Sequence, residues 1–154
     1  HPINWALAKT ISRDQKVLIK TAKGDVVIGL FIEEAPGSAI NFIELCNQKY
    51  FDGRFFHRVV PNFVAQSGCN RGDGYGSEAY SIRSEYSTKR YTEGSVGMAS
   101  AGKDTEGTQW FITHSPTPHL DGRYTIFAEV LSGMEVVHQL EVGDQVISAS
   151  FVKD

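Results

Sequence analysis

FFHRVVPNFVAQSG, residues 55–68, sets one arginine, Arg58, and one amide, Gln66, among aromatic and aliphatic side chains. The Phe and Val residues of this stretch predict a core β-strand. A guanidinium is unfavourable in such a strand, because removing a permanent charge from water carries a large desolvation penalty. Arg58 therefore either reaches solvent from a strand end, with its stem packed on apolar surface, or performs chemistry.

The length and composition predict one soluble domain with a single core. The chain has 154 residues, of which 41% are hydrophobic and 21% are charged, enough to bury most of the surface that the unfolded chain exposes. Its net charge of -3, without a run of Lys or Arg, argues against a nucleic-acid partner. No stretch approaches the roughly 18 consecutive apolar residues of a transmembrane helix, so membrane insertion is not expected.

The beginning of the chain leaves the cellular compartment open. Residues 1–14 lack an initiator Met and are expected to form an N-terminal extension or linker ahead of a domain at residues 15–154. Ile3, Leu7 and Ile11 could line a short helix in this extension. Because a targeting segment could have been removed, cytoplasm and periplasm both remain open as compartments.

The first half of the chain alternates strand and helix signals. Residues 16–32 predict a β-hairpin around the turn sequence AKGD. Pro36 suits the first turn of a helix within residues 33–51, where apolar side chains recur at roughly helical spacing. Residues 54–68 predict a return to strand.

The second half adds mostly short strands. Short apolar runs predict strands at residues 96–100, 109–113, 124–131 and 145–153. GMEVVHQLEVG, residues 133–143, predicts a second helix of about two turns. Many short strands with only two helices predict a mainly β fold, either a barrel or a sandwich.

Several familiar chemistries lack support in the sequence. Residues 97–104, GMASAGKD, resemble a phosphate-binding loop, but Asp104 stands where Ser or Thr must bind magnesium and no helix follows. His114 and His119 lack a framework of Cys or carboxylate ligands, so we expect no metal ion and no other cofactor. No Ser or Cys lies in a pattern typical of a nucleophile.

Two further segments carry a family resemblance together with residues 55–68. GMASAGKDTEGTQWFIT, residues 97–113, again mixes small residues, a Gln and aromatics, and HLDGRYTIFAEV follows at residues 119–130. In this order the three segments resemble the cyclophilins, a family of peptidyl-prolyl cis-trans isomerases, and the likeness covers roughly residues 15–153. The resemblance implies a closed eight-stranded antiparallel β-barrel capped by two α-helices.

The resemblance also implies roles for individual residues. The catalytic set would be Arg58, Gln66 and Phe63, with Gln66 positioning the guanidinium. The proline pocket would be formed by Phe63, Val64, Met98, Phe111 and Leu120. The groove for the peptide backbone would be lined by Ala99, Ser100 and Gln109, and further substrate contacts would come from His119 and Tyr124.

The implied reaction explains why an arginine is needed. Rotation about an X-Pro bond is slow because the nitrogen lone pair is delocalised into the carbonyl, with a barrier of about 18–20 kcal/mol. A guanidinium beside the prolyl nitrogen stabilises the twisted bond, in which that lone pair is localised. No proton transfer is required. His57 is next to Arg58 and is expected on the opposite face of the strand, in a structural role.

Departures from the family pattern limit what the resemblance implies. His119 stands where cyclosporin-sensitive members have Trp, so cyclosporin binding is expected to be weak. Ser100 replaces an Asn that contacts the peptide backbone in many members. Tyr124 and Val64 replace a His and a Met and change the shape of the proline site.

The expected partners are proline-containing peptides or unfolded proteins, bound by a monomeric domain. Two other functions remain open from the sequence. The domain could be a proline-peptide binding module of a larger protein with little isomerase activity. It could also be a carrier barrel for a small molecule, which would require an apolar interior cavity in place of packed side chains.

Overall fold

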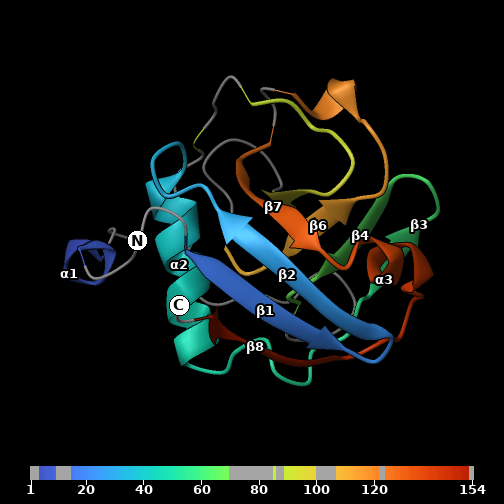
Figure 1. Ribbon diagram of the computed structural model, residues 1–154, viewed down its shortest axis with the longest axis horizontal. Helices are drawn as coiled ribbons and strands as arrows, with labels where there is room; N and C mark the ends of the chain where they lie inside the picture. The colour runs from blue at the N-terminus through green and yellow to red at the C-terminus, as the bar shows by residue number, and fades with distance from the viewer. Residues whose placement is uncertain are drawn as a thin grey trace.

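Eight strands form one antiparallel sheet that curls around a core (Figure 1). The structure, a computed structural model, describes residues 4–9, 15–69, 85, 89–99, 107–121 and 124–152. The strands are β1 (Lys16–Thr21), β2 (Gly24–Leu30), β3 (Arg58–Val60), β4 (Val64–Ser67), β5 (Ser95–Met98), β6 (Trp110–Thr113), β7 (Ile126–Ser132) and β8 (Val146–Val152). The helices are α1 (Trp5–Ala8), α2 (Pro36–Asn47), the short 3-10 helix η1 (Pro118–Leu120) and α3 (Met134–Gln139). Along the sheet the strand order is β3-β4-β6-β5-β7-β2-β1-β8.

The predicted β-hairpin at residues 16–32 is confirmed as β1 and β2. The two strands pair with Val17 opposite Ile28 and Ile19 opposite Val26. These four side chains are buried, while their neighbours along each strand are more exposed. This alternation with a period of two residues places one face of the hairpin on the core.

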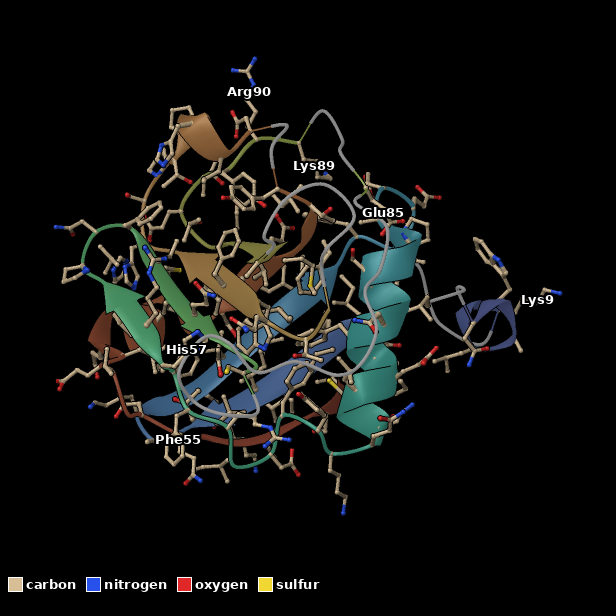
Figure 2. The ribbon with its side chains drawn as sticks, turned by 180° about the vertical axis from the view of Figure 1, so that it is seen from behind. Lys9, Phe55, His57, Glu85, Lys89 and Arg90 are labelled. Atoms are coloured by element: carbon tan, nitrogen blue, oxygen red, sulfur yellow. The ribbon has the colours of Figure 1, made fainter. Side chains whose placement is uncertain are left out.

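The two predicted helices are confirmed as α2 and α3, which lie at the left and the right of the view in Figure 1 and both contribute buried residues to the main core. Helix α2 begins at Pro36, as expected, because proline at the first turn gives up no helical hydrogen bond. The backbone amides of Gly37 and Ser38 donate to the carboxylate of Glu85 at 2.9 and 2.6 Å. Figure 2 shows Glu85 beside this end of α2. A residue distant in sequence therefore caps the helix.

The expectation of one strand over residues 54–68 is wrong, because the structure divides this stretch into β3 and β4. A turn at residues 61–63 separates the two strands. Pro61 cannot donate a backbone hydrogen bond, and Asn62 has a positive φ of 62°. Asn tolerates this left-handed conformation better than most residues. The chain therefore reverses here and forms a second hairpin.

The expectation of a closed barrel is also wrong, because the sheet is open between its two end strands. In the part of the chain that the structure describes, β3 pairs with β4 and β8 pairs with β1, but β3 and β8 form no ladder together. Backbone hydrogen bonds join residues 53–56 to residues 143–146 just ahead of these strands, with one bridge between Phe55 and Gln145. This contact does not continue into a ladder between the described residues of β3 and β8, and the fold is a curled half-barrel.

The two faces of β6 contribute to two separate apolar clusters. Trp110 is 1% exposed and lies in the main core, where its ring makes edge contacts with Phe42, Phe51 and Phe56 at centroid distances of 5.8, 6.2 and 5.8 Å. The next residue, Phe111, belongs to a smaller cluster. Successive residues of a strand point to opposite faces, which explains the division. The buried members of the smaller cluster are Val64, Tyr91, Phe111, Leu120 and Ile126.

The N-terminal residues include the short helix α1, which Asn4 caps by accepting from the amide of Leu7 at 3.0 Å. Leu7 lies in this helix and packs against the main core. Ile3 and Ile11 lie outside the described residues, and the domain boundary at residue 15 stays a prediction. Among the helices of the described ranges, none has the length and apolar character needed to cross a membrane.

Candidate active site

The hairpin of β3 and β4 places Arg58 directly opposite Gln66. Arg58 Nη1 donates to Gln66 Oε1 at 3.5 Å, and Gln66 Nε2 donates to Gln109 Oε1 at 3.1 Å. Gln66 thus accepts with its amide oxygen and donates with its amide nitrogen, which sets the orientation of the group. The exposed guanidinium stands at one end of this chain of hydrogen bonds, where a ligand can reach it.

A pocket of about 350 Å³ opens beside the guanidinium. One part of its wall is polar and consists of Arg58 and Gln66, and the remainder is mostly apolar. The apolar part is formed by Phe63, Val64, Ala99, Phe111, Leu120 and Tyr124. A volume of this size lies within the range of about 300–1,000 Å³ typical of small-ligand sites.

The pairing of β4 with β6 places polar and apolar side chains together in this pocket. Gln66 lies opposite Phe111, and Val64 lies two residues from Gln66 on the same face of β4. Leu120 reaches the pocket from the end of η1. Val64, Phe111 and Leu120 are each less than a tenth exposed, so the apolar part of the wall is held by packing.

Phe63 links the charged and apolar parts of the pocket from the turn between β3 and β4. Its ring centroid lies 5.9 Å from Cζ of Arg58, within the range of a cation–π contact. On the outer side of the pocket the ring stacks on that of His119, with centroids 5.5 Å apart and an angle of 29° between the planes. The carbonyl of Phe63 accepts from the amide of His114 at 2.8 Å, which joins the turn to the end of β6.

A known protein family matches the part of the chain that forms this pocket. The family described as cyclophilin type peptidyl-prolyl cis-trans isomerase/CLD matches residues 16–153, which include every pocket residue. The chain belongs to the cyclophilin family. The resemblance carried by the three sequence segments is thereby confirmed.

Curated relatives of this cyclophilin match it over most of their length. It is 46% identical over 117 residues to peptidyl-prolyl cis-trans isomerase B of Bacillus subtilis, covering 75% of this chain and 82% of the relative. It is 38% identical over 141 residues to a peptidyl-prolyl cis-trans isomerase of Synechococcus elongatus, covering 90% of this chain and 97% of the relative. This cyclophilin is therefore an enzyme of the peptidyl-prolyl cis-trans isomerase class.

Solved cyclophilin structures share the fold. The crystal structure of a cyclophilin-type isomerase from Cryptosporidium parvum superimposes with a TM-score of 0.87 at 28% identity, covering 92% of this chain and 99% of the other. A crystal structure of the same protein in the presence of the dipeptide Ala-Pro has a TM-score of 0.87 at 29% identity, covering 91% of this chain and all of the other.

The structure brings most of the predicted site residues of this cyclophilin together, but not all of them. Gln109 contacts the site through Gln66, and His119 lies at its rim through the stack on Phe63. Ser100 lies outside the described residues. The members of the predicted set that line the pocket are Arg58, Phe63, Val64, Gln66, Ala99, Phe111, Leu120 and Tyr124.

Met98 does not line the pocket, contrary to expectation. It is 1% exposed and packs in the main core. On β5, Gly97 pairs with Phe111 and Met98 pairs with Trp110, so the alternation of the strand turns Met98 toward the core. The sequence motif that contains Met98 identified the strand, but it did not indicate which face of the strand each residue occupies.

Tyr91 packs against this site and was not predicted from the sequence. Its ring stacks on Phe111, another buried member of the smaller apolar cluster. Residues 79–95 show no regular pattern in the sequence, so Tyr91 has no signal of its own. The nearest signal is Gly97, because a lone glycine within a strand often marks a close approach of another group.

His57 and His114 remain outside the pocket lining of this cyclophilin. His57 precedes β3 and is half-buried, and Figure 2 shows it beside the start of that strand. His114 is buried and stacks on His138 with ring centroids 5.5 Å apart, and His138 Nε2 lies 3.3 Å from Glu93 Oε1. Burial lowers the pKa of His114 below its ordinary value of 6.5, and the charge of His138 adds to this effect, while the backbone of Val60 and Val137 opposes it.

Acidification is expected to destabilise the folded cyclophilin through His114. Because its pKa is lowered in the folded chain, the unfolded chain binds more protons once the pH falls below 6.5. The stability contributed by neutral His114 is therefore present above pH 6.5 and is lost as the pH falls toward the folded pKa, by up to about 1.4 kcal/mol per pH unit.

Urea unfolding of the wild type and His114→Gln between about pH 5 and about pH 7.5 tests this expectation. The wild type should lose more stability than His114→Gln over this range. His119→Gln, which removes an exposed histidine, serves as the control and should keep the wild-type slope. Equal slopes for the wild type and His114→Gln would contradict the assignment to His114.

Proposed function

We propose that this cyclophilin accelerates rotation about X-Pro bonds by placing the guanidinium of Arg58 beside the prolyl nitrogen. The proline ring would occupy the apolar part of the pocket, against Phe63, Phe111 and Leu120. The observation that carries the proposal is the joint lining of one pocket by Arg58 and these apolar side chains. The isomerase activity of the family supports the reaction, and the roles of the residues are our inference.

The proposed mechanism stabilises the twisted amide selectively. In the planar amide the nitrogen lone pair is delocalised, so the nitrogen is a poor hydrogen-bond acceptor. When the bond twists, the lone pair becomes localised and interacts more strongly with the guanidinium of Arg58. Only an interaction that is stronger in the transition state than in the ground state raises the rate of the chemical step. A turnover of about 10² to 10³ per second would require the barrier to fall by roughly 5–7 kcal/mol.

Gln66 and the apolar wall have separate tasks in this proposal. The hydrogen bond from Arg58 to Gln66, together with that from Gln66 to Gln109, limits the directions that the guanidinium can take. Phe63, Phe111 and Leu120 would hold the proline ring still while the carbonyl on its N-terminal side rotates. All of these residues come from one chain, so a monomer suffices.

The proposed substrates are proline-containing peptides or segments of unfolded proteins. The presence of the dipeptide Ala-Pro in a crystal of the Cryptosporidium parvum cyclophilin supports this class of ligand. The pocket is exposed at Arg58, so an extended peptide can approach without unfolding the domain.

A prolyl isomerisation assay tests the proposal directly. The slow phase of a short peptide with one Ala-Pro bond should shorten in proportion to the concentration of the purified protein. An unchanged slow phase, with the peptide still bound, would contradict the proposal and indicate a proline-peptide binding module. Neither acceleration nor binding would exclude both functions.

Cyclosporin binding is expected to be weak in the wild type and stronger in His119→Trp. The ring of His119 stacks on Phe63 at the rim, where an indole would add apolar surface and one hydrogen-bond donor. One added hydrogen bond together with this apolar surface should raise the affinity about tenfold or more. Calorimetric titration of both proteins measures the difference, and equal affinities would show that residue 119 does not limit cyclosporin binding.

A further inference from the structure

Tyr91 forms the layer behind the apolar wall of the pocket. It is 2% exposed, and its ring stacks on that of Phe111 with centroids 5.7 Å apart and an angle of 22° between the planes. Phe111 lines the pocket. The ring of Tyr91 therefore supports the wall from the side that a ligand does not reach.

The hydroxyl of Tyr91 holds a second part of the same wall. It lies 3.1 Å from the carbonyl oxygens of both Tyr124 and Thr125 and can donate to either. The Thr125 carbonyl also accepts from the amide of Met98 at 2.9 Å, so loss of the hydroxyl would affect mainly the Tyr124 carbonyl. Tyr124 lines the pocket and makes an edge contact with Phe111.

The backbone of Tyr91 anchors the segment that carries Leu120. Its amide donates to Asp121 Oδ1 at 2.6 Å, and its carbonyl accepts from the amide of Thr117 at 3.0 Å. These two contacts lie on either side of Leu120. One residue thus touches Phe111 by its ring, Tyr124 by its hydroxyl and the Leu120 segment by its backbone.

Gly97 provides the space that this arrangement requires. A Cβ at this position would lie 2.3 Å from the hydroxyl oxygen of Tyr91 and 2.6 Å from Cζ of Phe111. Both distances are far shorter than a van der Waals contact, so any other residue would displace one of the two rings. The tyrosine at position 91 can pack here only because residue 97 is a glycine and has no side chain.

We infer that Tyr91 is a positioning residue that holds the proline pocket in its binding shape by joining Phe111 to the Tyr124 wall. The inference rests on the proposed function, because the pocket is taken to hold the proline ring. Tyr91 does not line the pocket, and Arg58 lies at the other, polar part of the wall. Tyr91 therefore affects how firmly the ring is held and leaves the interaction of Arg58 with the twisted bond unchanged.

The substitution Tyr91→Phe keeps the ring and removes only the hydroxyl. It is expected to raise KM for a peptide with one Ala-Pro bond about 2- to 10-fold, which is the loss of affinity expected when one hydrogen bond is removed. The value of kcat should change less than about 2-fold. The dissociation constant of the same peptide, measured by titration, should rise by the same factor as KM. Tyr50→Phe is the matched control, because it removes the hydroxyl of another buried tyrosine, one that does not line the pocket and lies 3.4 Å from Thr108 Oγ1.

The pair Tyr91 and Gly97 permits a test by rescue. Gly97→Ala should lower kcat/KM about 10-fold or more, since its Cβ overlaps both rings. Adding Tyr91→Phe removes the atom that lies 2.3 Å from this Cβ, so the double variant should be more active than Gly97→Ala alone. Gly29→Ala is the control for a glycine within a strand, because the nearest atoms to its Cβ belong to the half-exposed side chain of Leu131, at 3.0 Å or more. It should keep wild-type activity.

The outcomes separate this inference from the proposed function. If the wild type binds the peptide but does not accelerate isomerisation, the proposed function fails, and weaker binding by Tyr91→Phe would still support the inference. If the wild type is active and Tyr91→Phe matches Tyr50→Phe in KM and dissociation constant, the inference is overturned. It is also overturned if the fold loss of kcat/KM in the double variant equals the product of the fold losses in the two single variants. Positions 91 and 97 would then act independently.

Discussion

Arg58→Ala is expected to lower kcat/KM for X-Pro isomerisation by about 10²-fold or more, comparable to the loss of one charge-stabilising donor in other enzymes. The proposed reaction depends on one fixed positive charge beside the prolyl nitrogen, and no other described cation lines the pocket. The fold should persist, because Arg58 is exposed and surface substitutions usually change stability by less than about 0.5 kcal/mol. A normal thermal unfolding midpoint together with the loss of activity would identify a chemical role.

Arg58→Lys should recover little of this activity. A lysine carries the same charge, but it is a mobile point charge that cannot hold Gln66 and the prolyl nitrogen with one planar group. Arg54→Ala is the matched control, since Arg54 lies four residues earlier in the chain and does not line the pocket. The guanidinium of Arg54 lies over the ring of Tyr50 and donates to the backbone carbonyl of Tyr50. If Arg58→Ala and Arg54→Ala retain equal activity, the proposed role of the guanidinium is incorrect.

Trp110→Ala is expected to have the largest effect on stability, a loss of about 3–5 kcal/mol in the free energy of unfolding. Trp110 is among the largest fully buried side chains that the structure describes, and three phenylalanine rings contact its edges or face. Its removal leaves a cavity that these rings cannot fill without moving. A domain of this size has a total stability of about 5–15 kcal/mol, so the variant would be marginally folded.

Urea unfolding monitored by circular dichroism measures this loss, with Phe55→Ala as the control. Phe55 lies in the stretch that also carries Arg58, but it is 46% exposed, and Figure 2 shows it at the surface. Its removal should lower the free energy of unfolding by less than about 1 kcal/mol. Similar losses for the two variants would mean that Trp110 is not central to the core.

Local sequence signals predicted the elements whose formation depends on neighbouring residues. The hairpin of β1 and β2 follows from two β-branched runs around a short turn, and the start of α2 follows from Pro36. The spacing of Arg58 and Gln66 along the sequence allows them to lie opposite each other on one hairpin, and both line the pocket together with Phe63 from the turn.

Signals of this kind could not predict contacts between distant segments. The division of residues 54–68 into two strands depends on a turn in which Asn62 adopts a left-handed conformation. The apolar residues on both sides of this turn predict a single strand. The assignment of Met98 to the pocket failed because a motif does not tell which face of β5 meets which cluster. The open edge between β3 and β8 depends on how far two strands remote in sequence run side by side.

The amino-acid sequence by itself determined the family, the mainly β class and the identity of the residues at the polar part of the pocket. Only the tertiary structure decided that Tyr91 lies behind Phe111, that Gly97 makes room for it and that Met98 belongs to the core. The physical reason is that side-chain type and local spacing specify chemistry and strand faces. The partner that each face meets is set by packing between segments that the chain brings together from far apart.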